Sequence, residues 1–156
     1  MKNKKKIKVK ILRAKKKDFP SILKLINELA VFEKLAPPKK AAIKRLKKDA
    51  FGKNPKFKVL VAVSGKEIVA YAFYFFTYSS FLAKPTLYLE DFYVKEDIRR
   101  FGIGKKIFDE LIKISRKEKC GRMEWCVLDW NKNAIAFYDK AGAKALNDWI
   151  YYRVVF

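Results

Sequence analysis

Hydrophobic and polar residues alternate with two different periods in the first third of the chain. Apolar side chains at every second position of residues 7–11, with lysines between them, predict a strand with one apolar face. Apolar residues then recur at helical spacing up to Phe32, and two prolines at 37–38 end this first predicted helix. A second helix, very rich in lysine, is predicted for residues 39–51, with Gly52 ending it.

From residue 57 onward the pattern is that of strands. An apolar run at 58–63, a Ser-Gly-Lys turn and a β-branched and aromatic run at 68–78 predict a hairpin. The remaining chain predicts a strand at 86–94, a helix at 103–119, a strand at 123–128, a short helix capped by Asn133 and ending near Gly142, and a last strand at 148–156.

This order of elements predicts an α/β fold, in which one mixed sheet carries helices on both faces. No repeat or linker interrupts the 156 residues, so we expect a single domain over residues 1–156, beginning with a Lys-rich segment at 1–6. A domain of this length buries roughly 68–70% of its unfolded surface, which is enough for a stable core.

Composition excludes several kinds of site. The chain has no His, which removes His-based triads and zinc sites that need imidazole. Its two cysteines, Cys120 and Cys126, cannot form a four-thiolate centre, so we expect no metal. Few cysteines and no secretory apolar segment favour the cytoplasm. The longest uncharged stretch, 68–83, is shorter than the ~18 residues of a membrane helix, and we expect no membrane partner.

The net charge suggests an anionic partner. Lys and Arg number 37 against 16 Asp and Glu, which gives a formal charge of +21. The candidates are nucleic acid, an anionic membrane surface and a phosphate-rich cofactor. The alternative is a solvated surface with a compositional bias toward lysine.

The loop before the helix at 103–119 carries the most specific chemical signal. Gly102 and Gly104 let backbone N–H groups turn inward where a helix start presents unpaired donors, an arrangement that suits a pyrophosphate. A plain tight turn is the alternative. The loop is not a dinucleotide fingerprint, because Ile107 stands where the third glycine would be, and it lacks the Gly-Lys-Ser/Thr of a Walker loop.

Residues 99–104, Arg-Arg-Phe-Gly-Ile-Gly, match the Arg/Gln-x-x-Gly-x-Gly/Ala signature of the GNAT acyl-CoA N-acetyltransferases. The chain resembles that superfamily, and within it the spermidine/spermine (diamine) and thialysine acetyltransferase group. Residues 87–94, 129–131 and 136–138 fit as well, and the resemblance runs from about residue 7 to residue 149. It implies a mostly antiparallel sheet with a splayed parallel strand pair, one strand ending near Val94, and acetyl-CoA bound where the pair separates.

The resemblance also implies the residues that hold acetyl-CoA. The pantetheine arm would pair with the backbone of one strand, the pyrophosphate would lie on the amides of the glycine loop, and the next loop and helix would support the cofactor. In chain order these residues are Phe92, Tyr93, Val94, Arg99, Arg100, Phe101, Gly102, Ile103, Gly104, Lys105, Asn131, Lys132, Asn133, Ala134 and Tyr138.

Two residues are the catalytic candidates. Carboxylates within an apolar strand are costly to bury, and adjacent strand positions point to opposite faces, so we expect at most one of Glu90 and Asp91 to face a given cavity. The resemblance implies that Glu90 accepts a proton from the amine, with ammonium binding as the alternative role. It implies that Tyr138 protonates the leaving thiolate, with aromatic anchoring of its helix as the alternative. Without His to activate Cys126, we expect direct transfer in a ternary complex.

The acceptor implied by the resemblance is a small primary amine, a diamine, polyamine or thialysine-like compound. Ser79 replaces an acidic residue of the family and Phe32 replaces a tyrosine, and both departures favour a short amine over a long polyamine. The implied pocket residues are Phe32, Glu33, Glu90, Asp91, Glu124, Trp125, Cys126 and Asp148.

Two alternatives remain open for the function. One is acetylation of lysine in a protein or as an amino acid, and the other, less favoured, is a basic nucleic-acid-associated module that has lost catalysis. The resemblance further implies a homodimer whose last strand packs on or exchanges with the partner. An internal edge strand would show the same apolar, aromatic pattern.

Overall fold

A computed structural model describes residues 7–156, and the Lys-rich segment at 1–6 lies outside the described residues. The chain divides into two compact units, one ending at Trp125 and one comprising Cys126–Phe156. Among the described residues no helix is both long and apolar enough to cross a membrane.

The first unit is built on a five-stranded sheet in the order β1-β2-β3-β4-β5. Neighbouring strands are antiparallel except for β4 and β5, which are parallel. The strands are β1 (Lys10–Arg13), β2 (Lys58–Ser64), β3 (Glu67–Ser79), β4 (Lys84–Val94) and β5 (Arg122–Trp125). The sheet is therefore mixed and mostly antiparallel, as expected.

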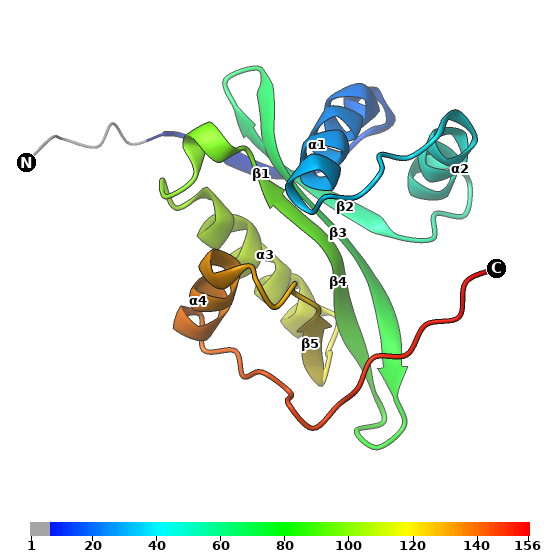
Figure 1. The fold of residues 1–156 in the computed structure, drawn as a ribbon, viewed down its shortest axis with the longest axis vertical. Helices are drawn as coiled ribbons and strands as arrows, with labels where there is room; N and C mark the ends of the chain where they lie inside the picture. The colour runs from blue at the N-terminus through cyan, green and yellow to red at the C-terminus, as the bar shows by residue number, and fades with distance from the viewer. Residues whose placement is uncertain (1–6) are drawn as a thin grey trace, which may run out of the picture. The chain divides into compact units, whose positions relative to one another are not determined.

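Helices cover both faces of this sheet (Figure 1). On one face, α1 (Phe19–Phe32) and α2 (Lys40–Phe51) close a core that includes Ile22 and Tyr71. On the other face, α3 (Ile103–Lys117) closes a second core that includes Leu89. Two short 3-10 helices, η1 (Lys16–Asp18) and η2 (Glu96–Ile98), precede α1 and α3.

A β-bulge interrupts the pairing of β3 with β4. Asp91 pairs with Phe73, and the next β3 residue, Tyr74, pairs with Leu89, so Glu90 is the extra residue. The parallel pairing of β4 with β5 also ends at Leu89. Because β4 continues to Val94, its last five residues extend beyond the β5 pairing, which is the separation expected of the parallel strand pair.

The second unit contains one helix, α4 (Lys132–Lys140). Asn131 is its N-cap, and the side-chain oxygen of Asn131 accepts a hydrogen bond from the N–H of Ala134 at 3.2 Å. Gly142, with φ of 85°, follows the helix end.

The structure corrects several predicted elements. Residues 148–156 form no strand, because a strand needs a neighbour for its backbone groups and this segment has no ladder partner in the described chain. The strand predicted at 123–128 is β5 and ends at Trp125, and the first strand is Lys10–Arg13 rather than 7–11. The cap of α4 is Asn131 rather than Asn133, and α3 ends at Lys117.

Candidate active site

The bulge in β4 places Glu90 and Asp91 on the same face of the sheet. Leu89 and Phe92 both pack into the core beneath α3, so the two residues between them lie off that face. Asp91 pairs with Phe73, which belongs to the core beneath α1 and α2. The expectation that at most one of the two carboxylates faces a given cavity was wrong, because the bulge inserts one residue and reverses the alternation.

Asp91 is surrounded by groups that disfavour its charge. The hydroxyl of Tyr71 donates a hydrogen bond to the Asp91 carboxylate at 3.4 Å. The pKa of Asp91 is raised to about 6, chiefly by burial and then by the negative charges of Glu90 and Glu33, while the Tyr71 bond acts in the opposite direction. A bound cation would relieve this repulsion, because an opposite charge favours the ionised form.

The third carboxylate comes from the end of α1. Glu33 is the C-cap residue of that helix, directly after Phe32, and burial raises the pKa of its carboxyl. Its charge reaches both Asp91 and Tyr71, since it raises the pKa of each. We call Glu33, Glu90 and Asp91 the carboxylate cluster.

The glycine loop has left-handed backbone conformations that suit an anion site. Gly102, the N-cap of α3, has φ of 79°, and Arg100 has φ of 68°, both in the left-handed region. Because the N-cap residue of α3 is a glycine, it supplies no side-chain bond to the amides of the first turn. Successive backbone N–H groups in such left-handed and helical conformations form concave anion sites.

A β-carbon at Gly104 would lie 3.5 Å from Phe92 and 3.8 Å from Val94, so the start of α3 packs closely against the end of β4. Phe101 and Ile103 pack into the core beneath α3, and Ile103 is fully buried. These contacts hold the loop beside the free end of β4.

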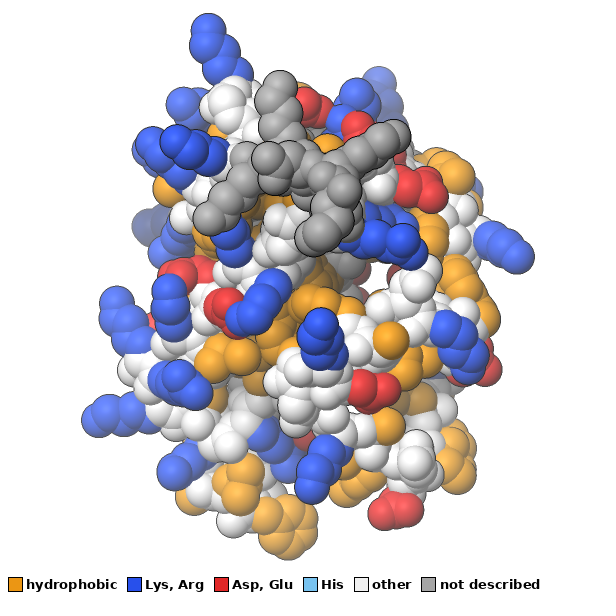
Figure 2. Space-filling model, turned by 90° about the vertical axis from the view of Figure 1, so that its left-hand side faces the viewer, with side chains coloured by type: hydrophobic (Ala, Val, Ile, Leu, Met, Phe, Trp, Pro, Cys, Tyr) orange, Lys and Arg blue, Asp and Glu red, His pale blue; other side chains and the backbone are white. Residues whose placement is uncertain are grey.

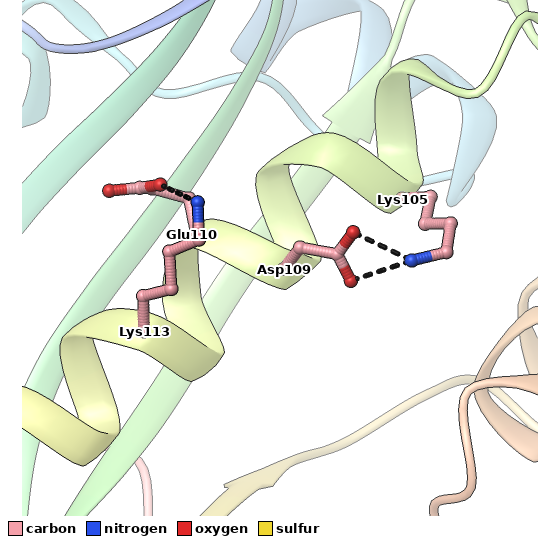
Figure 3. A network of polar contacts seen from close by, with 4 residues as sticks. All are labelled: Lys105, Asp109, Glu110 and Lys113. Atoms are coloured by element: carbon pink, nitrogen blue, oxygen red, sulfur yellow. Dashed lines mark hydrogen bonds and ion pairs between the residues drawn. The ribbon is translucent and has the colours of Figure 1, made fainter.

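Lys105 follows the loop on the exposed surface of α3. Its ammonium pairs with Asp109 at 2.6 Å, and Lys113 pairs with Glu110 on the next turn (Figure 3). Exposed pairs of this kind are worth about 0.3–0.5 kcal/mol, so Lys105 can exchange Asp109 for another anion at small cost.

The residues predicted on β5 do not lie on one face. Trp125 packs edge-to-face against Phe108 of α3, with ring centroids 5.4 Å apart, and belongs to the core beneath α3. Glu124 is paired with Tyr88 in the parallel register, and an Arg122 nitrogen lies 3.0 Å from its carboxylate. The structure therefore does not bring Trp125 to the carboxylate cluster.

The remaining predicted residues belong to the second unit. Tyr138 lies on α4, its ring centroid is 5.3 Å from that of Phe137, and burial raises the pKa of Tyr138 to about 12, so the phenol keeps its proton at neutral pH. Lys132 donates a hydrogen bond to the carbonyl of Asp129 at 2.7 Å. Asn133, Cys126 and Asp148 are exposed.

Among the described residues no group of three or more His, Cys, Asp or Glu side chains is arranged to hold a metal ion.

Sequence reasoning missed Tyr71, and it missed the aromatic contacts of Arg99. Tyr71 was predicted only as part of a strand, although its hydroxyl bonds Asp91. Arg99 was predicted as a coenzyme-binding residue, and its guanidinium lies over the rings of Phe32 and Tyr93. The Tyr71–Asp91 bond and the Arg99–Phe32 contact join residues far apart in the sequence, and no local pattern indicates either of them.

Comparisons with known proteins agree with the resemblance seen in the sequence. The model of the acetyltransferase (GNAT) family matches residues 20–143. A thialysine N-ε-acetyltransferase of Sus scrofa is 38% identical over 148 residues, which cover 90% of this chain and 86% of that protein. A human spermidine/spermine N(1)-acetyltransferase-like protein 1 is 38% identical over 144 residues, 88% of this chain and 21% of that protein.

Solved structures share the fold. A structure described as a possible acetyltransferase from Clostridium difficile 630 superposes with a TM-score of 0.82 at 23% identity, and the match covers 95% of this chain and 98% of that one.

Proposed function

The chain belongs to the GNAT acetyltransferase family, and from that premise we propose that it transfers the acetyl group of acetyl-CoA to a primary amine of a small molecule. The observation that carries the proposal is the bulge at Glu90. It sets two carboxylates on one face of β4 at the residue where the pairing with β5 ends.

The residues of the first unit fit coenzyme A. The end of β4 beyond Leu89 offers backbone groups that an extended pantetheine arm can pair with, as an added strand does. The uncapped start of α3, with left-handed Arg100 and Gly102 before it, suits the pyrophosphate. Phe92, Tyr93 and Val94 would contact the pantetheine arm, and the loop through Lys105 would contact the pyrophosphate. Bound acetyl-CoA supplies the activated acyl group.

The carboxylate cluster suits an ammonium group. Three acidic side chains concentrate negative charge at this site, and the raised pKa of Asp91 indicates that this charge is incompletely balanced. An amine is mostly protonated at neutral pH and needs a base before it can attack a carbonyl carbon. We assign that role to Glu90, which is exposed and adjacent to Asp91, while Asp91 and Glu33 hold the cation.

Tyr138 is proposed as the acid that protonates the departing thiolate. Its pKa of about 12 keeps the proton available at neutral pH. Asn131 caps α4 and so fixes the start of the helix that carries Tyr138. With no His in the chain to activate Cys126, transfer is proposed to be direct, without an acetylated enzyme.

The acceptor is proposed to be a short amine of the thialysine or diamine type. The named relatives act on thialysine or carry the spermidine/spermine name. Ser79, where the family has an acid, is buried and its hydroxyl accepts a hydrogen bond from the N–H of Leu82 at 3.3 Å, so it adds no charge for a second ammonium. We further propose one domain, a cytoplasmic location and a homodimer.

The test is release of free thiol from acetyl-CoA in the presence of diamines, polyamines, thialysine or lysine. We expect release only with an amine, and a loss of about 10²-fold in turnover for Tyr138→Phe, as for removal of a general acid. Glu90→Gln should lower the rate most at low pH, where more amine is protonated. Tyr78→Phe, at an exposed β3 position, is the matched control and should leave the rate unchanged.

Two results would contradict the proposal. The first is no thiol release with any of these amines. The second is tight, salt-sensitive binding of nucleic acid by a protein without transferase activity, which would favour the binding module instead.

A further inference from the structure

The side chain of Arg99 is held by groups from two different elements. Its guanidinium carbon is 5.0 Å from the ring centroid of Phe32, on α1, and 5.3 Å from that of Tyr93, on β4. Its Nε donates a hydrogen bond to the carbonyl of Val94 at 2.9 Å. A side chain with these three contacts joins the last turn of α1 to the end of β4.

Both elements carry parts of the carboxylate cluster. Phe32 is followed directly by Glu33, whose charge contributes to the raised pKa of Asp91. Tyr93 lies two residues after Asp91, and the pKa of its hydroxyl is raised by burial and by the nearby charge of Glu28 on α1. Arg99 therefore lies where the acceptor side of the proposed site meets the glycine loop.

The combination of these contacts suits arginine better than lysine, although a lysine ammonium can also lie over an aromatic ring, as Lys58 does over Phe76. A planar guanidinium can lie against aromatic rings with its faces while its edge donates hydrogen bonds, and a lysine ammonium has neither the plane nor the Nε donor. Phosphate is bound by the edge of a guanidinium, so the stack does not by itself exclude a phosphate contact. The stack also places Arg99 in contact with Phe32, so a change at either residue alters the surroundings of the other.

We propose that Arg99 is a positioning residue of the acceptor pocket, which fixes Phe32 and thereby Glu33 against β4 and couples the coenzyme loop to amine binding. The proposal rests on the proposed function. Arg99 lies within five residues of the start of α3. When coenzyme A orders the glycine loop, it therefore also orders the contacts of Arg99 with Phe32 and Tyr93. By thermodynamic reciprocity, a bound amine then favours coenzyme binding by the same factor.

The experiment compares Arg99→Lys and Arg99→Gln with the wild type at saturating acetyl-CoA. We expect KM for the amine to rise about fivefold, the change expected from one cation–π contact of ordinary strength, with kcat changed less than twofold. Arg116→Gln, at an exposed arginine in the last turn of α3 and away from the proposed site, is the control and should leave the amine KM unchanged.

A double-mutant cycle with Phe32→Leu separates positioning from phosphate binding. In the Phe32→Leu background, Arg99→Lys should raise the amine KM by a smaller factor, because the contact between Arg99 and Phe32 is already absent. An equal effect in both backgrounds would overturn the proposal, and so would a rise confined to the KM of acetyl-CoA.

Failure of the proposed function is distinguishable from failure of this proposal. If the wild type acetylates no amine, the function is wrong, and the coupling is then read from titration calorimetry of coenzyme A alone. Non-additive effects of Arg99→Lys and Phe32→Leu on the coenzyme dissociation constant would support the coupling between loop and α1, and additive effects would overturn it.

Discussion

At the scale of single residues, Asp91 shows how position within a sheet sets chemistry. It lies in an apolar strand and accepts a hydrogen bond from the Tyr71 hydroxyl. The negative charges of Glu90 and Glu33 also act on its carboxylate. Burial and the two neighbouring carboxylates favour the protonated form of Asp91, whereas the hydrogen bond from Tyr71 favours the ionised form. The cluster therefore stores electrostatic repulsion that a cationic ligand can relieve.

This repulsion predicts a pH dependence of stability. The pKa of Asp91 is raised from 3.8 to about 6, so the native state binds the proton more tightly than the unfolded chain does. Stability should fall as pH rises from about 4 to about 6. Asp91→Asn should remove this fall and be more stable than the wild type at pH 7, by on the order of 2 kcal/mol, in urea unfolding curves recorded across this range.

Asp97→Asn, at an exposed position, is the control for the loss of one negative charge, and it should keep the pH dependence of the wild type. Parallel curves for the wild type and Asp91→Asn would contradict the assignment.

At the scale of elements, the loop between β4 and α3 combines two glycines with different roles. Gly102 has φ of 79°, which L side chains rarely adopt, while a β-carbon there would meet nothing within 4 Å. Gly104 is helical, and a β-carbon would make an ordinary contact with Phe92 at 3.5 Å. The first glycine is thus required by backbone conformation and the second is not.

We therefore predict opposite effects of the same substitution. Gly102→Ala should lower the free energy of unfolding by about 1 kcal/mol, because it places a β-carbon in the left-handed region. Gly104→Ala should be neutral or stabilising by up to about 1 kcal/mol, because alanine is the better helix former. Urea unfolding of both variants measures the difference, and a larger loss for Gly104→Ala would refute it.

At the scale of the whole molecule, the positive charge is widely spread. Figure 2 shows lysine and arginine side chains distributed over the face that it draws, with some acidic side chains between them. A net charge of +21 repels a polycation at long range, but salt screens this field beyond about 8–10 Å. The field therefore disfavours a long polyamine more than a short amine held within the cluster.

The apolar end of the chain supports the proposed homodimer. Trp149, Ile150, Tyr152 and Val154 are all at least 76% exposed, and exposed apolar segments of this kind mark interaction sites. The wild type should sediment as a dimer at micromolar concentration. Ile150→Lys with Val154→Lys should shift it toward the monomer, because burying two charges in an apolar interface is costly.

Phe81→Lys is the control, since Phe81 is fully exposed but belongs to the turn between β3 and β4. It should leave the sedimentation unchanged. A monomeric wild type, or a dimer that the double substitution does not weaken, would refute the assembly.

The fold was largely predictable because its signals are local. An apolar run at 58–63 and a β-branched and aromatic run at 68–78 predicted β2 and β3, and helical spacing predicted α1 and α3. The last strand was not predictable, because residues 148–156 have the composition of a strand, while pairing depends on a neighbour that the segment itself does not specify.

The sequence by itself determined the family, the glycine loop and the identity of the candidate acid and base, because these depend on residue type and spacing. Tertiary structure alone decided that Glu90 and Asp91 share a face, since the bulge arises from the register between β3 and β4. It alone decided that Arg99 lies over Phe32 and Tyr93. Contacts between distant elements follow from packing of the whole sheet, which no local pattern of the chain encodes.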